Sequence, residues 1–479
     1  MEFPTRLQEH PEVVCYPYTG DTAEGAAFVM ARVAGQEVLI LAGNPDVLHE
    51  FQGAAKEYGK LCPLTHANRL AINRYFPYTI PQAMGRAATT LGLGDRLGLA
   101  NYAHLLCIRE KNVLPILAQQ SMRELQLTHR TYEDVLDAAV WAVFRAGWRY
   151  GFGADGDHLK NEADIAAALA CGYSMITLDC SEVLQPVPEA PSQRRRAYLA
   201  LPEELRAVLE RTYGGRTVGL GFSYSQDRLE ELAICYGQAI ALCCRVWRLL
   251  QNAGRAVDLE LSLDETAFIT APDAHFFVAA ELQRCGVSLN SLAPKFVGEF
   301  QKGVDYIGDP RAFAQDLSVH CRIADFFGYK ISVHSGSDKF SVFPAVGQCT
   351  GGRFHLKTAG TSWLEAVRVI AKQEPDLYRR MHRRALEVLT QARAYYVVHA
   401  DPARIEPLDR RPDDSLPGYM DEDDARQLLH ITYGFLLDTP GMKQDIYQAL
   451  DRHREEYQTG LEHHIGAHVA RLGIGPRTL

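Results

Sequence analysis

Apolar and polar residues alternate in two short runs, and each run predicts a β-strand with one polar face. Residues 330–334 (KISVH) alternate Ile and Val with polar residues, so that His334 ends the strand just before a polar Ser-Gly-Ser turn. Residues 257–264 (VDLELSLD) place three leucines on one face and four polar residues, including Glu260, on the other. In an antiparallel sheet this polar face would meet solvent. In a closed parallel barrel it would line the lumen, where carboxylates need partners.

From about residue 88 the chain repeats a unit of strand, polar turn and helix. Eight strands are predicted, at residues 89–93, 150–157, 175–179, 257–264, 289–296, 330–334, 354–357 and 428–432. Strands that alternate with helices pair in parallel through right-handed crossovers, and eight such units favour an α/β fold of the TIM-type (β/α)8 barrel over an open doubly wound sheet. Neither GxGxxG at a strand-to-helix turn nor GxxxxGK(S/T) is present, so a nucleotide-binding fold has no support.

The same patterns divide the chain into three parts. Residues 1–85 predict an N-terminal extension, an α+β layer with a hairpin between strands 28–33 and 36–41 joined through Ala34 and Gly35. Residues 86–440 predict the barrel, and residues 441–479 a helical tail that packs on it. Residues 183–215, rich in Pro and Arg, predict a surface insertion.

The composition indicates which kinds of molecule the protein is expected to bind. The net charge is −9, without a basic stripe, so nucleic acid is not an expected partner, and an anionic substrate needs local positive charge. The sequence has no run of 18 apolar residues and no signal peptide, so no membrane partner is expected. Eleven cysteines without a CxxC pair indicate reduced thiols and a cytoplasmic protein. The sequence leaves a homo-oligomer open.

Active-site residues of such a barrel lie at the C-terminal ends of its strands. The residues found there are Asp95, Arg96, Asp155, Asp157, His158, Asp179, Glu260, Asp264, Glu265, Lys295, His334, Lys357 and His430. Each alone is consistent with a capping or salt-bridging role, and a lone histidine at a strand end is most often structural. Their recurrence predicts a metal site with acid–base groups. Two histidines and an oxygen ligand suit a divalent Mn, Co, Ni or Zn ion.

Six segments carry a family resemblance. They are GLGDRLG (92–98), GADGDHLK (153–160), ELSLDET (260–266), SLAPKFVGEFQKGVDYIGD (291–309), VHSGSDKF (333–340) and HLKTAGTSW (355–363). Together they resemble the tagaturonate/fructuronate epimerase family, which also includes tagatose 4-epimerases. The resemblance runs from about residue 85 to 440 and also touches LTHANRLAINRYFPYTIP in the N-terminal extension.

The resemblance implies a divalent-metal-dependent epimerase and a role for each of five residues. Asp157 resembles the proton acceptor, Glu260 the proton donor, and His158 and His334 two metal ligands. Gln301 stands where a further ligand is expected. Because an amide oxygen is a weaker ligand than a carboxylate, either the metal is held loosely or that ligand lies elsewhere.

Further residues at strand ends complete the predicted site. Glu265 is the alternative to Glu260. Asp95, Arg96, Lys295 and Lys357 are expected to bind the substrate.

The expected substrates are the keto-sugar acids D-tagaturonate and D-fructuronate, or the keto-sugars D-tagatose and D-fructose. The members of each pair differ at a carbinol carbon β to the ketone, and a ketone acidifies only its α-hydrogens. Two routes remain, retro-aldol cleavage with recombination and transient oxidation by a nicotinamide. The missing dinucleotide motif favours the retro-aldol route. The alternatives are a metal-dependent aldose–ketose isomerase and a non-catalytic barrel that binds a sugar acid.

Overall fold

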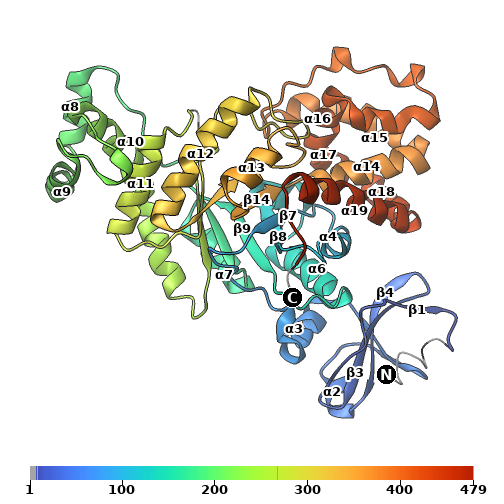
Figure 1. Cartoon of the computed structure of the whole chain (residues 1–479). Helices are drawn as coiled ribbons and strands as arrows, with labels where there is room; N and C mark the ends of the chain where they lie inside the picture. Colours follow the sequence, from blue (N-terminus) through green and yellow to red (C-terminus); the bar gives the residue numbers. More distant parts are fainter. Residues whose placement is uncertain (1–6, 8, 267, 478–479) are drawn as a thin grey trace.

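Eight parallel strands close into a barrel at the centre of the chain (Figure 1). The structure, a computed structural model, describes residues 7, 9–266 and 268–477. The barrel strands are β7 (Thr90–Leu93), β8 (Leu114–Ser121), β9 (Gly153–Leu159), β10 (Met175–Asp179), β11 (Asp258–Ser262), β12 (Ser291–Ala293), β13 (Lys330–Val333) and β14 (Phe354–Thr358). Each strand pairs with its neighbours in sequence, and β14 pairs with β7 to close the ring. The predicted TIM-type barrel is confirmed.

Seven of the eight predicted strands coincide with barrel strands, and one is wrong. Residues 428–432 belong largely to helix α16 (Asp423–Ile431), whose residues from Ala425 onward are all buried. A short apolar run such as LLHIT cannot be distinguished from a buried helical segment by its periodicity. The eighth strand is β8, whose Pro115 argues against a central strand from sequence alone.

Helices surround the barrel and separate its strands in sequence. They are α4 (Asn101–Cys107), α5 (Met122–Thr128), α6 (Tyr132–Arg145), α7 (Glu162–Cys171), α8 (Pro191–Leu199), α9 (Glu203–Tyr213), α10 (Gln226–Gln251), α11 (Pro272–Arg284), α12 (Pro310–Phe327) and α13 (Phe343–Cys349). A 3-10 turn, η2 (Gly219–Gly221), precedes α10. The predicted surface insertion forms α8 and α9 at the periphery of the molecule (Figure 1).

Helix α10 is long and apolar enough, by length and composition alone, to cross a membrane. Half of its most apolar window is buried, and the helix packs on α8 and α11. A core helix passes the same test, so the expected absence of a membrane partner stays a prediction.

The N-terminal extension is an antiparallel sheet, as predicted. Its strands are β1 (Val13–Cys15), β2 (Asp21–Ala23), β3 (Ala26–Val33), β4 (Gln36–Gly43), β5 (Ala54–Lys56) and β6 (Gly59–Pro63), and its helical segments are α2 (Pro45–His49), α3 (His66–Tyr75) and η1 (Pro77–Thr79). The predicted hairpin joins β3 to β4 through Ala34 and Gly35, both at positive φ. Trp141 and Phe144 of α6 complete the apolar core of the sheet and so attach it to the barrel.

In the part of the chain that the structure describes, the elements after the last barrel strand are all helical. They are α14 (Thr361–Gln373), α15 (Pro375–Ala392), η3 (Pro402–Arg404), η4 (Leu408–Arg410), η5 (Asp413–Asp421), α16, α17 (Tyr433–Asp438), α18 (Met442–Arg452) and α19 (Arg454–Arg471). Helices α14 to α18 share a separate apolar core, and α19 packs on α4 and α14. The division at residues 85 and 440 stays a proposal.

Candidate active site

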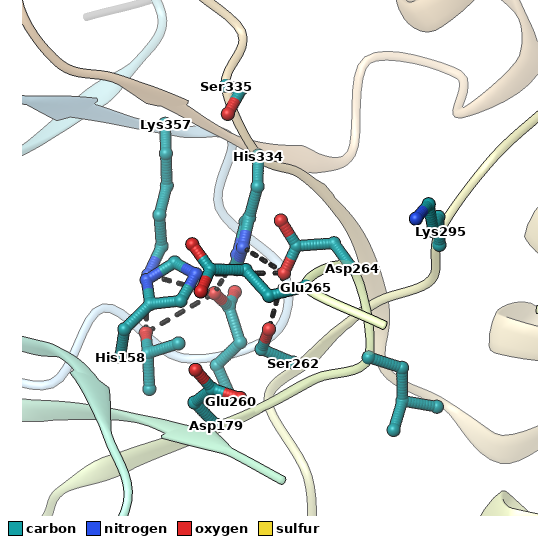
Figure 2. A network of polar contacts seen from close by, with 12 residues as sticks. His158, Asp179, Glu260, Ser262, Asp264, Glu265, Lys295, His334, Ser335 and Lys357 are labelled. Atoms are coloured by element: carbon teal, nitrogen blue, oxygen red, sulfur yellow. Dashed lines mark hydrogen bonds and ion pairs between the residues drawn. The ribbon is translucent and has the colours of Figure 1, made fainter. Parts of the chain in front are cut away.

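A narrow polar cavity lies at the C-terminal ends of the barrel strands. Its walls are Gln119, Ser121, Arg123, Glu124, Asp157, His158, Asp264, Glu265, Lys302, His334, Ser335, Lys357, Ala359 and Tyr396. Figure 2 shows the His158, Asp264, His334 and Lys357 side chains pointing toward one another from different strands. This is where active sites of such barrels are found.

A larger cavity, of about 880 Å³, lies between the N-terminal sheet, α4 and helices α18 and α19. Four of its polar side chains are bonded to one another, since the Glu37 carboxylate accepts hydrogen bonds from Tyr16 Oη (2.6 Å) and from Arg145 and Arg454. No histidine of the described part of the chain lines this larger cavity, whereas His158 and His334 line the cavity at the barrel mouth. The cavity at the barrel mouth is therefore the candidate active site.

Three side chains in the mouth fit a metal ion. One ligand atom from each of His158, Asp264 and His334 lies within 4.8 Å of the others. Asp264 Oδ1 is 2.9 Å from His334 Nδ1 and 3.6 Å from His158 Nε2. His158 Nε2 is buried and has no hydrogen-bond partner among the described residues. Two imidazoles with a carboxylate are a donor set that suits Mn, Co, Ni or Zn.

The backbone adopts an unusual conformation at His158 and directly after His334. His158 has a φ of 53°, and Ser335, directly after His334, has a φ of 49°. Non-glycine residues rarely adopt this left-handed region, and such strain is concentrated at functional sites. The strand ends are therefore shaped to present these rings to the cavity.

In each histidine, the ring nitrogen that faces away from the proposed metal site contacts a carboxylate. His158 Nδ1 lies 2.9 Å from Asp157 Oδ1, and His334 Nε2 lies 2.6 Å from Glu260 Oε1. Metal-binding histidines usually donate their second ring N–H to such a carboxylate, which fixes the ring and its tautomer. Burial lowers the pKa of His158, but Asp157 outweighs it and holds this pKa well above its usual value, so the pocket favours positive charge.

Lys357 links the carboxylates inside the barrel. Its Nζ lies 2.6 Å from Asp157 Oδ1, 2.7 Å from Asp155 Oδ2 and 3.0 Å from Glu260 Oε1. Burial lowers the pKa of Lys357, yet these three carboxylates hold it well above its ordinary value. Burial raises the pKa of Asp155 to about 6, whereas Lys357 and His158 overcome burial and hold the pKa of Asp157 well below its usual value.

Three residues expected to bind substrate do not line the cavity. Asp95 accepts backbone hydrogen bonds at the start of α4, including one from Ala100 N (2.7 Å). Arg96 is buried against Glu124 and stacks on the Tyr433 ring. Lys295 lies apart from the cluster (Figure 2) and donates to the Thr266 carbonyl.

Gln301 also lies outside the cavity wall. Its Oε1 accepts hydrogen bonds from His399 N (3.1 Å) and Gln427 Nε2 (2.9 Å). These donors occupy the oxygen that a metal would need, so the geometry supports Asp264 as the third ligand and leaves Gln301 a prediction.

The chain is similar to known proteins over almost its whole length. The model of the tagaturonate epimerase family matches residues 16–472. The tagaturonate/fructuronate epimerase of Thermotoga maritima is 37% identical over 458 residues, which cover 94% of this chain and 95% of that protein. The chain belongs to the tagaturonate epimerase family.

Solved structures agree with this membership. Two crystal structures of the fructuronate-tagaturonate epimerase of Cohnella laeviribosi, one native and one with one glycerol, are 47% and 46% identical to the chain. Each has a TM-score of 0.95, and the matches cover 98% of this chain and 99% of those chains. The predicted family is confirmed, and the chain is an epimerase, an enzyme of the isomerase class.

Several cavity residues of this family member were missed from the sequence. The strand β8, which the residue pattern does not predict, carries Gln119 and Ser121. Helix α5 directly after it carries Arg123 and Glu124. Lys302 lies on the loop after β12, where no periodicity marks it. Asp264 was noted at a strand end, but nothing in the sequence singled it out from Asp179 or Glu265.

The loop after His334 is fixed by the last helix of the chain. The buried Asp338 carboxylate contacts His464 Nε2 (2.6 Å) and Arg426 Nη2 (2.8 Å), while its backbone N–H donates to His468 Nε2 (3.0 Å). Burial lowers the pKa of His468 to about 4, so its Nε2 is a neutral acceptor. The ligand atoms of Asp338, His464 and His468 also lie close enough together to hold a metal ion. Because these atoms already form hydrogen bonds and ion pairs with one another, we assign the three residues to anchoring the loop.

We expect Asp338→Asn to destabilise the protein by about 3 kcal/mol, because it leaves the partners of a buried ion pair uncompensated. Burial raises the pKa of Asp338, but His464 and Arg426 hold it well below the ordinary value. Because the pKa of Asp338 is lower in the folded than in the unfolded protein, its ionised carboxylate stabilises the fold above a pH of about 3.9, the usual unfolded-state pKa. It stabilises the fold less as the pH falls below that value. The Tm difference between the variant and the natural protein should therefore shrink as the pH falls below about 4. A difference that does not change with pH would contradict the ionic contribution.

Proposed function

We propose that this chain is a divalent-metal-dependent epimerase that interconverts D-tagaturonate and D-fructuronate. The observation that carries this proposal is the convergence of His158, His334 and Asp264 at the barrel mouth, with Asp157 beside them. The names of the relatives from Thermotoga maritima and Cohnella laeviribosi point to the same pair of sugar acids. D-Tagatose and D-fructose are the neutral substrates against which the preference is to be measured.

A bound divalent cation would be held by His158, His334 and Asp264, and it supplies positive charge that stabilises negative charge developing on substrate oxygens. Asp157 is the base that lines the cavity, and it is ionised because Lys357 and His158 hold its pKa low. It removes the proton of the hydroxyl on the inverted carbon when the carbon–carbon bond breaks. It returns that proton after the aldehyde has turned and recombined.

Glu260 has a different position from Asp157. It is fully buried, does not line the cavity, and contacts His334 and Lys357. We propose that it orients the His334 ring and Lys357. The proton-donor role suggested by the family resemblance stays a prediction, and Glu265, the alternative to Glu260, lines the cavity.

One labelling experiment tests both the activity and its route. D-Tagaturonate with deuterium on the inverted carbon should be converted by metal-loaded protein into D-fructuronate that keeps the label, because no bond to that hydrogen breaks. Proton and carbon NMR follow the product and the label. Protein treated with a chelator should lose turnover and regain it with Mn, Co, Ni or Zn.

Other outcomes select other functions. Loss of the label to solvent would contradict retro-aldol cleavage and indicate proton transfer at carbon. An aldose as the only product would indicate an aldose–ketose isomerase. Binding of the sugar acid with no turnover in any metal would indicate a non-catalytic barrel.

The compartment and the assembly belong to the same proposal. All eleven cysteines are free thiols, and only Cys285 is exposed. This usage suits a reducing cytoplasm, where we place the enzyme. A homo-oligomer stays a prediction, to be measured by sedimentation.

A further inference from the structure

Two positively charged side chains in the cavity wall have donors without partners. Lys302 Nζ donates to Ser335 Oγ (3.0 Å), and no carboxylate of the described residues lies within 4.0 Å of it. Arg123 contacts the Tyr395 carbonyl (2.9 Å) and, at 3.4 Å, the Glu265 carboxylate. Arg123 Nε is buried and makes no hydrogen bond to any described residue.

The remaining charged groups nearby are already paired. The Lys357 ammonium is shared by Asp155, Asp157 and Glu260. The Glu124 carboxylate is bonded to Arg96 at 2.9 Å. Among the described residues, Arg123 and Lys302 are therefore the cations of this wall that keep unbonded donors, with Glu265 beside Arg123 at 3.4 Å as the one carboxylate that either of them contacts.

The overall charge makes local cations necessary. A protein of net charge −9 repels an anionic substrate, so its site must supply compensating positive charge. Arginine binds carboxylates through paired N–H donors, and lysine supplies a compact charge on a flexible stem. A keto-sugar acid carries one carboxylate, and the matching keto-sugar carries none.

We propose that Arg123 and Lys302 bind the terminal carboxylate of the substrate and so select the keto-sugar acid over the neutral keto-sugar. This inference rests on the proposed function. Ser335, which accepts from Lys302, directly follows His334, so the carboxylate lies beside the metal-binding cluster.

The position of the carboxylate in the substrate gives Arg123 and Lys302 a second role, during the cleavage step. In a keto-sugar acid the carboxylate lies two carbons beyond the inverted carbon, on the side away from the ketone. When the carbon–carbon bond breaks, its electron pair stays on the ketone side and the hydroxyl proton passes to Asp157. The aldehyde fragment then carries the carboxylate, so Arg123 and Lys302 hold the fragment that has to turn.

Lys302→Gln tests the assignment, with metal-loaded protein and both substrates. We expect kcat/KM for D-tagaturonate to fall about 10–100-fold, the usual loss for a hydrogen bond to a charged group, while kcat/KM for D-tagatose stays the same or rises. Arg123→Gln should shift the ratio in the same direction. Lys160→Gln is the matched control, because Lys160 lies near the mouth but is paired with Glu182 at 2.8 Å, and the ratio should not change.

A binding measurement separates this inference from the proposed function. D-Galactonate, which has the carboxylate but no ketone, should bind the natural protein more tightly than galactitol, and Lys302→Gln should remove that preference. Natural protein that shows this preference but epimerises neither substrate would contradict the proposed function and support the carboxylate site. An equal fall for both substrates in Lys302→Gln, or no change for the acid, would overturn the site.

Discussion

Replacing Asp157 with asparagine should lower turnover roughly 10²–10⁴-fold, the usual contribution of a positioned acid–base group. Asparagine keeps the shape of the side chain and can still contact His158 Nδ1 and Lys357, which lie 2.9 and 2.6 Å from Oδ1. It lacks the negative charge needed to accept a hydroxyl proton. The protein should therefore fold and bind metal as before, and the loss should appear in kcat.

Asp155→Asn is the matched control for this prediction. Asp155 is equally enclosed and lies 2.7 Å from the same Lys357 ammonium, but it does not line the cavity. Because burial raises the pKa of Asp155 to about 6, replacing it with the neutral asparagine changes the charge at this position less than the same replacement does at Asp157. Equal losses in both variants would show that Asp157 acts only through the charge balance of Lys357, and the base would have to be sought elsewhere.

Replacing Asp264 with alanine should empty the metal site. It removes the oxygen that lies 2.9 Å from His334 Nδ1 and 3.6 Å from His158 Nε2. Loss of residues behind metal ligands typically costs roughly 10–100-fold in affinity, and loss of a ligand should cost more. Titration of chelated protein with Zn or Mn, followed by elemental analysis of the washed protein, measures the effect.

Gln301→Ala is the informative comparison. Its amide oxygen is bonded to His399 N and Gln427 Nε2, so its removal should loosen that loop while leaving metal affinity within a few-fold of the natural value. If Gln301→Ala emptied the site and Asp264→Ala did not, the ligand suggested by the family resemblance would stand, and the assignment of Asp264 would be wrong.

The fold could largely be predicted from residue patterns. Alternation in residues 257–264 predicted a polar face in the lumen, and Glu260 lies there, bonded to Ser291 and His334. The two errors have different causes. LLHIT is too short for its period to be decided. The strand β8 has eight residues, but it carries a proline at its second position and ends in polar residues.

The site could be predicted only in part, because a position at a strand end does not determine what a side chain contacts. His158 and His334 meet, yet Asp95 turns back to cap α4 and Lys295 bonds to a carbonyl. Lys302 and Tyr396 reach the cavity from two loops distant in sequence, and only tertiary packing brings them there.

The bond between Asp338 and the last helix has a consequence for biosynthesis. Translation delivers the barrel strands first, and His468 is added 130 residues after Asp338. A nascent chain that has emerged only as far as β14 has its barrel strands but lacks the anchor for the loop behind His334. The ribosome must therefore release the chain through His468 before the loop behind His334 can be anchored.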